Sequence, residues 1–492
     1  MSKEQSSYRQ IFKATSLFGG VQVFNIIISI IRSKIVAILL GPAGMGIFGL
    51  FTTTINLIGG ITNFGLSNSA IRNIAAATDS NDYNRIAKVV RVVKKLVWLT
   101  GLLGSLVTLV LAPWLSSTTF GNTQYSSAFY WLAISLLFNQ LTVGQNVLLQ
   151  GMRKLTYLAK ANMLGSLLSL VVSVPFYYFY KLNGIVPAMV LTSICSMFIS
   201  WYYSRNIKLE TVTPTRKETI VEAKDMLKMG FLLSVSGFIT LGESYLIRIY
   251  INNTGSLDDV GFYNAGFAII GTYVGMVFTA MGTDYYPRLS MVAKDNEKAK
   301  ELINQQAEIA ILLLAPILCA FLIFINWAVM ILYSHQFTPV SELIHWAALG
   351  MYFKAASWAI GFVFLAKGNG KLFFWSEIAA LSYLFLFNVI GYKFWKLEGL
   401  GMSFLAAYLV CYFQVFYIAK IKYNFSFQHQ FYKIFIIQLT LGLSSFCISR
   451  YMPFPWNYVI GTLFIALSAG YSIREMDKRL DFRSILVKIK SR

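Results

Sequence analysis

The sequence predicts an all-α integral membrane protein with fourteen transmembrane helices and both termini in the cytoplasm. Of its 492 residues, 56% are hydrophobic and 13% are charged, and the mean hydropathy is +0.60. This share of apolar residues is far larger than a soluble domain of the same length needs to fill its core. The apolar residues gather in runs of about 20, which is long enough for a helix to cross about 30 Å of hydrocarbon. The polar gaps between the runs carry Lys and Arg asymmetrically.

The apolar runs follow one another with short polar gaps, and each is expected to form one helix. The first run follows a polar start and is too long for a signal-peptide core, so we expect it to remain as the first membrane helix. The fourteen helices are expected near residues 16–40, 45–70, 93–115, 128–150, 157–180, 184–203, 229–251, 261–286, 307–333, 343–366, 372–395, 399–419, 433–450 and 456–473.

The basic residues predict the orientation of these helices. Of the 42 Lys and Arg, 34 lie in the N-terminal segment, the even-numbered gaps and the C-terminal tail. The opposite face carries only Lys181, Lys393, Lys396 and Arg450. The positive-inside rule therefore places both termini in the cytoplasm. Because the positive charge lies in loops at a membrane surface, we expect membrane lipids and no nucleic acid as partners.

A long polar gap at residues 205–228 predicts two lobes. We expect an N-terminal six-helix lobe at 1–204, a cytoplasmic linker at 205–228, a C-terminal six-helix lobe at 229–420, and an extra helix pair with a basic tail at 421–492. A shift of 217 residues pairs Gly44 with Gly261, as repeated lobes would require. Because six is an even number, two repeated six-helix lobes would have the same orientation and be related by an axis along the membrane normal. A substrate is expected at the interface between the two lobes.

Three stretches of the sequence carry a family resemblance. The first is KIVAILLGPAGMG at Lys34–Gly46, and the second is YYPRLS at Tyr285–Ser290. The third runs from Gln336 to Glu377 and includes Trp346, Gly350, Lys354 and Ala366-Lys367. Together they resemble Wzx-type O-antigen and lipid III flippases of the MOP (multidrug/oligosaccharidyl-lipid/polysaccharide) superfamily. The resemblance covers most of the first twelve helices. The last helix pair departs from the twelve crossings of lipid III flippases.

The resemblance implies two six-helix bundles around a central cavity. It also implies a flippase that moves an undecaprenyl-diphosphate-linked oligosaccharide from the cytoplasmic to the periplasmic leaflet by alternating access. The location would be the bacterial inner membrane, and polysaccharide polymerase machinery is a further expected partner. A multidrug antiporter of the MATE type is the alternative within the superfamily. A membrane polysaccharide polymerase or glycosyltransferase is a weaker one, because the outward gaps offer no substantial catalytic loop.

Four basic residues lie within the apolar runs and are the expected ligands of the diphosphate: Arg32, Lys34, Arg248 and Lys354. A cation that faces lipid at this depth would cost several kcal/mol, whereas a cation in a wet cavity can bind phosphate. Arg32 and Lys34 are about 200° apart around a helix, so one is expected in the cavity and the other in a structural role. Arg248 either lines the cavity or extends to the periplasmic surface.

Lys354 is the cation expected nearest the bilayer midplane, about 17 Å into its helix at 1.5 Å per residue. Glu243 is the deepest carboxylate, and it either couples transport to a proton or sodium ion or pairs with a neighbouring cation. Asn146 belongs to a stripe of amides on the fourth run together with Asn139 and Gln150. This stripe either binds sugar hydroxyls or holds two helices together.

The sequence contains no pattern typical of an enzyme, a metal site or a cofactor site. The three histidines lack HExxH spacing, and neither a GxSxG elbow nor a phosphate-binding P-loop is present. The four cysteines, which lie far apart inside apolar runs, lack the spacing of a zinc site. We therefore expect a transporter without a cofactor.

Overall fold

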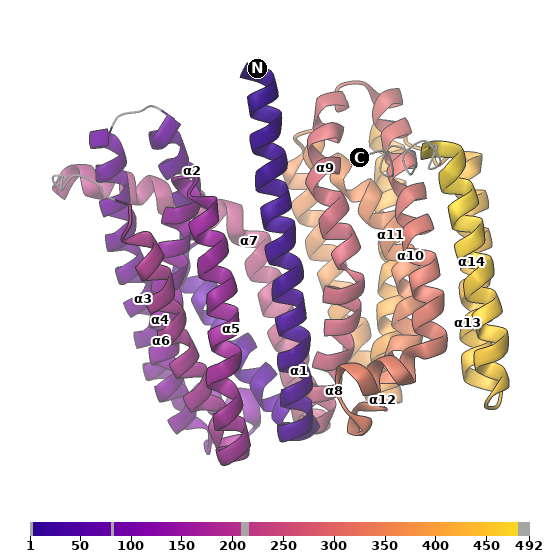
Figure 1. The fold of residues 1–492 in the computed structure, drawn as a ribbon, viewed down its shortest axis with the longest axis horizontal. Coiled ribbons are helices and arrows are strands. Elements are labelled where there is room, and N and C mark those ends of the chain that lie inside the picture. The colour runs from indigo at the N-terminus through magenta and orange to yellow at the C-terminus, as the bar shows by residue number, and fades with distance from the viewer. Residues whose placement is uncertain (1–2, 80–82, 208–215, 481–492) are drawn as a thin grey trace. The chain divides into compact units, whose positions relative to one another are not determined.

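The computed structural model describes residues 3–79, 83–207 and 216–480, which form helices and short connections without a strand among them (Figure 1). In this part of the chain, ten helical segments are long and apolar enough to cross a membrane, or eleven if the bent helix α7 (Arg216–Thr254) is counted as one span. The prediction of an all-α, multi-pass membrane protein is confirmed. Parts of the predicted linker, 208–215, and tail, 481–492, lie outside the described residues.

The chain divides into two compact units, Met1–Gly261 and Phe262–Arg492. The N-terminal unit contains α1 (Lys3–Asn63), α2 (Leu66–Asp79), α3 (Tyr83–Phe120), α4 (Ser126–Gly151), α5 (Leu155–Tyr180), η1 (Lys181–Gly184), α6 (Ile185–Ser204), α7 and the start of α8 (Leu257–Phe267). Within this unit α4 packs against α3 and α6, α5 against α6 and α1, and α7 against α1, α2 and α3. The boundary between the two units therefore lies one helix after the polar gap at 205–228, where the sequence predicts the linker.

The first part of α7 packs on the core of the N-terminal unit. Two parts of this helix, Thr219–Phe231 and Ser234–Thr254, meet at an angle of 54°. Met226 is fully buried in an apolar cluster formed by α2, α3 and α4. Residues 219–228, which the sequence assigns to a linker, thus belong to a helix that packs through Ala223, Met226 and Leu227.

Helix α1 is broken near its middle, where the sequence reads Gly41-Pro42. Gly41 has φ 67° and ψ −170°, a conformation that side chains with a Cβ rarely adopt. Pro42 lacks an amide hydrogen and suits the first position of the helix that follows. Gly46 lies against the start of α8, where an added Cβ would collide with the carbonyl oxygen of Leu257. The glycines of the Lys34–Gly46 stretch thus serve a kink and a close backbone contact.

The C-terminal unit contains the end of α8, then η2 (Ala268–Val274), α9 (Met276–Val292), α10 (Asn296–Leu332), η3 (His335–Phe337), α11 (Val340–Ala366), α12 (Gly370–Tyr423), α13 (His429–Tyr451) and α14 (Trp456–Leu480). Helix α11 packs along α12, and α10 contacts α11, α13 and α14. Helix α12 is interrupted at Trp395 and Lys396, where Lys396 has φ 50°. This break falls between the two apolar runs expected near 372–395 and 399–419.

Candidate functional site

A polar cavity of about 390 Å³ lies inside the N-terminal unit, between α1, α4, α5 and α6. Its polar lining consists of Asn25, Ser29, Arg32, Thr142, Asn162, Ser166, Ser169, Ser196 and Ser200. These residues lie within segments apolar enough to cross the bilayer. Hydroxyl and amide groups at such depth provide hydrogen-bond partners that the hydrocarbon does not. The cavity can therefore accommodate a polar group.

Arg32 is the one cation among the residues that line this cavity. Its guanidinium carbon lies 5.2 Å from the ring centroid of Phe48, which follows the kink of α1. Its Nε is buried and has no hydrogen-bond partner among the described residues. A buried donor without a partner is costly, and an anionic oxygen would satisfy it. The geometry around Arg32 therefore suits a phosphate.

Neither Lys34 nor Asn146 is among the residues that line this cavity. Lys34 is half-buried on α1. The Asn146 side-chain oxygen accepts a hydrogen bond of 3.3 Å from the hydroxyl of Ser200, a lining residue. This hydrogen bond joins α4 to α6, and a role of Asn146 toward sugar hydroxyls stays a prediction.

Glu243 and Arg248 lie on the second part of α7, and both are half-buried. The Glu243 Oε1 is buried without a hydrogen-bond partner among the described residues. The Arg248 guanidinium donates a 2.7 Å hydrogen bond to the carbonyl oxygen of Ser244 and also contacts the hydroxyl of that residue. Arg248 therefore uses some of its N–H donors on Ser244, which lies one turn earlier on the same helix.

A second cavity, of about 250 Å³, lies in the C-terminal unit between α11 and α12. Lys354 lines it together with Glu377 and Tyr408. The Lys354 ammonium lies 5.9, 5.7 and 5.0 Å from the ring centroids of Phe278, Phe404 and Tyr408. Its side chain forms no hydrogen bond or ion pair with another described residue. Three aromatic faces thus stabilise a cation at membrane depth and leave its N–H donors to a ligand.

The sequence identifies Lys354 but not the residues around it. Phe278 lies on α9, whereas Phe404 and Tyr408 lie on the second part of α12. Aromatic residues make up 16% of the chain, so their positions in the sequence carry little signal. The four-residue spacing of Phe404 and Tyr408 places them on one helix face, but nothing local connects that face to Lys354.

The two family-like stretches in the C-terminal unit also have packing roles. The hydroxyl of Tyr285 donates to the carbonyl oxygen of Ala359 at 2.6 Å, which joins α9 to α11. Lys367, just after α11, donates to the side-chain oxygen of Asn296 at 2.6 Å and to a backbone carbonyl. Partial burial lowers the pKa of Lys367. The indole Nε1–H of Trp346 donates a 2.9 Å hydrogen bond to Oε1 of Glu398, which joins α11 to α12.

No group of three or more His, Cys, Asp and Glu side chains with the arrangement of a metal site occurs among residues 3–79, 83–207 and 216–480.

Comparison with known proteins identifies related sequences and folds. The lipid III flippase of Escherichia coli (strain K12) is 22% identical over 397 residues, which cover 77% of this chain and 90% of that protein. The lipid II flippase MurJ in an inward closed conformation has the same fold, with a TM-score of 0.68 at 14% identity over 94% of this chain and 99% of that one.

An inward-facing multidrug resistance MATE family transporter of the MOP superfamily also has this fold. Its TM-score is 0.67 at 15% identity, and the match covers 82% of this chain and 94% of that one. The two structural matches have nearly equal scores, so the fold alone does not separate lipid flippases from drug transporters. The polysaccharide biosynthesis protein family matches residues 35–342. The family match covers more than half of the chain, which therefore belongs to the polysaccharide biosynthesis protein family.

Proposed function

We propose that this protein is a flippase that moves a lipid-linked oligosaccharide, such as an O-antigen repeat unit on undecaprenyl diphosphate, from the cytoplasmic to the periplasmic leaflet. One observation carries the proposal. Each unit holds a cation in a cavity at membrane depth, Arg32 or Lys354, and neither has a carboxylate partner among the described residues. A diphosphate would be prohibitively costly to move through hydrocarbon alone, and such cations lower that cost.

The topology that supports this function has fourteen crossings with both termini in the cytoplasm. Three of the ten membrane-length segments, Gly20–Asn63, Leu155–Ser204 and Gly370–Tyr423, each contain two of the apolar runs, and α7 supplies one more crossing. The positive-inside asymmetry of the loops supports the cytoplasmic termini. The bacterial inner membrane is the corresponding location.

Alternating access between two lobes is the proposed mechanism, with a proton or sodium ion as the coupling ion. Glu243 is the proposed coupling residue, because one of its oxygens is buried and lacks a hydrogen-bond partner among the described residues. In this scheme Arg32 and Lys354 each provide a diphosphate ligand within their own unit, and Lys34, Arg248 and Asn146 are further proposed substrate-binding residues. Polysaccharide polymerase machinery would then receive the product in the periplasm.

The fold is compatible with a MATE-type antiporter as the alternative. The side chains in the two cavities support that alternative less well. A carrier of hydrophobic cations would benefit from unpaired carboxylates in its cavities. The cavity around Arg32 has no acidic residue in its lining, and the lining of the cavity around Lys354 contains one lysine and one glutamate, which form no ion pair. An anion fits this charge pattern better than a cation does.

Purified protein in proteoliposomes tests the proposal directly. A fluorescent undecaprenyl-diphosphate-linked oligosaccharide is placed in one leaflet, and its arrival in the other is measured by a sugar-oxidising or lectin reagent that does not cross the bilayer. We expect movement above that of protein-free vesicles. Export of a hydrophobic cation such as ethidium, without movement of the lipid-linked sugar, would establish the antiporter instead.

A further inference from the structure

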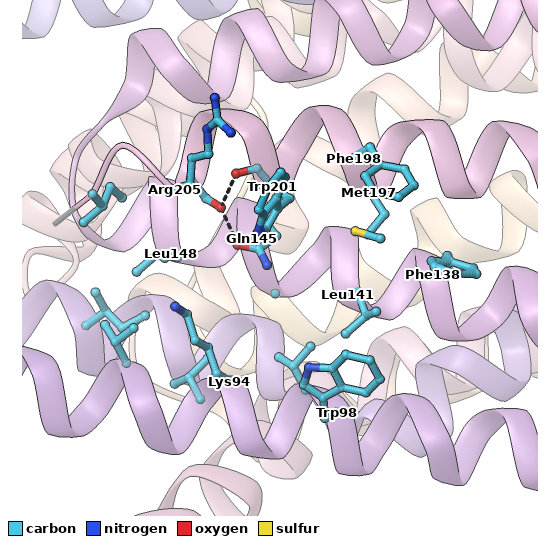
Figure 2. A pocket seen from close by; sticks show the side chains of 17 residues that line it. Lys94, Trp98, Phe138, Leu141, Gln145, Leu148, Met197, Phe198, Trp201 and Arg205 are labelled. Carbon is cyan, nitrogen blue, oxygen red and sulfur yellow. Dashed lines mark hydrogen bonds between the residues drawn. The ribbon is translucent and has the colours of Figure 1, made fainter. Parts of the chain in front are cut away.

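A lateral groove of about 560 Å³ lies on the N-terminal unit, apart from the cavity around Arg32 (Figure 2). Helix α4 forms its floor because it packs against both α3 and α6, which form the walls. The groove is open to the side, since Trp98 on α3 and Trp201 on α6 are 51% and 46% exposed. Its surroundings at this depth are therefore the bilayer rather than the interior of the unit.

One end of the groove is basic. Lys94 extends from α3 toward α6, and Arg205 lies on the rim with its guanidinium directed away from Lys94 (Figure 2). Arg205 stacks over Tyr202, with its guanidinium carbon 4.5 Å from the ring centroid. Neither cation has a carboxylate partner among the described residues, and no acidic residue lines the groove. This end therefore attracts an anion.

The rest of the groove is apolar and about one leaflet deep. Phe138, Leu141 and Leu148 lie along the floor on α4, and Met197 lies on the α6 wall. From Leu148 to Phe138 the floor is about 15 Å long at 1.5 Å per residue. This is half of the roughly 30 Å thickness of the hydrocarbon core. The length suits an acyl chain that starts at one surface and ends near the midplane.

We propose that this groove binds an anionic glycerophospholipid of the cytoplasmic leaflet. Lys94 contacts the phosphate, Arg205 adds positive charge at the rim beside the headgroup, and one acyl chain lies along the α4 floor. Trp98 and Trp201 lie where indole rings favour the boundary between headgroups and chains. The two cations border the two most basic internal gaps of the sequence, which the proposed topology places at the anionic inner surface. The proposal requires this orientation but not the oligosaccharide cargo.

Native mass spectrometry of the full-length protein tests the proposal. Wild-type protein and variants are incubated with phosphatidylglycerol or phosphatidylethanolamine that carry identical acyl chains. We expect wild type to retain phosphatidylglycerol preferentially, and Lys94→Gln to lower that preference about fivefold, as expected for one surface cation. The double variant Lys94→Gln/Arg205→Gln should bind both lipids alike. Lys95→Gln is the matched control, because Lys95 is an exposed neighbour on α3 that does not line the groove.

Three results would overturn the proposal. Equal retention of the two lipids by wild type would show that the headgroup charge is not recognised. An equal effect of Lys95→Gln and Lys94→Gln would show attraction to general surface charge. Displacement of phosphatidylglycerol by inorganic phosphate alone, or Lys94-dependent displacement by a lower concentration of undecaprenyl phosphate, would assign the groove to a free anion or to the cargo. Size-exclusion profiles confirm that each variant is folded.

Discussion

The ammonium of Lys354 on α11 lies 5.0 Å from the ring centroid of Tyr408 on α12, and both residues line one cavity. This contact joins the two helices that pack along each other in the C-terminal unit. The ring stabilises the charge of Lys354 without using its hydrogen-bond donors. The N–H donors of Lys354 are therefore left to a ligand at a depth where an ammonium that faces lipid would be costly.

Replacing Lys354 tests the proposed diphosphate site. Lys354→Ala should lower the rate of flipping by about 10- to 100-fold, which corresponds to the loss of a charged hydrogen bond worth about 1.5–3 kcal/mol. Lys354→Arg should retain part of the activity because it keeps the charge. The measurement is lipid-linked sugar movement in proteoliposomes at matched protein levels. Lys371→Ala, an exposed lysine outside the cavity, is the control. Wild-type flipping by Lys354→Ala would refute the assignment.

Arg32 and Lys34 can be distinguished by parallel neutral substitutions. Because Arg32 lines the polar cavity and Lys34 does not, Arg32→Gln should reduce flipping by about 10-fold or more, as for a lost charged hydrogen bond. Lys34→Gln should have a smaller effect on the rate. The same proteoliposome assay compares the two variants. If Lys34→Gln is the more damaging change, Lys34 and not Arg32 is the phosphate ligand.

Glu243→Gln tests ion coupling. If the buried carboxylate carries the coupling ion, the variant should still bind the lipid-linked oligosaccharide but should no longer respond to an imposed proton or sodium gradient. Flipping rates measured with and without each gradient give the answer. Asp225→Asn, an exposed acid on the first part of the same helix, should behave as wild type. A full gradient response in Glu243→Gln would exclude this residue as the coupling site.

Gly46→Ala tests the close contact between α1 and the start of α8. The added Cβ would collide with the backbone carbonyl of Leu257, so we expect a loss of about 1–3 kcal/mol in the free energy of unfolding, typical of overpacking. Gly59→Ala is the matched control because no atom lies within 4 Å of its added Cβ. Thermal unfolding in detergent compares the two. Equal melting temperatures would contradict the contact.

Arg479 is expected to fasten the last helix to the C-terminal unit. Its Nε lies 2.8 Å from Oε2 of Glu308 on α10, whose side chain is 6% exposed. Arg479→Met should lower the free energy of unfolding by about 1–3 kcal/mol, because Glu308 would stay buried without this partner. Lys478→Met should change stability little, since the Lys478 side chain is 55% exposed. A variant pair with the same melting temperature would argue against this role.

The sequence by itself determined the helical, membrane-spanning character of the protein. Length and hydropathy act locally, so runs near 16–40 and 372–395 end at the breaks that the structure has at Gly41 and at Trp395 and Lys396. The sequence also identifies the isolated cations, because a charged residue inside an apolar run departs from the pattern around it. The sequence alone therefore identified Lys354 and Arg32 as candidates for a polar role, together with Lys34 and Arg248.

Only the tertiary structure decided what surrounds each of these residues. It placed Arg32, but not Lys34, among the cavity-lining residues, and it grouped Phe278 and Tyr408 around Lys354. It also placed Met226, from a predicted linker, in an apolar core. Lipid tails and protein interiors are similarly apolar, so a membrane helix is apolar on most sides and its periodicity does not show which face meets a neighbour. Packing between helices that lie far apart in the sequence decides that face.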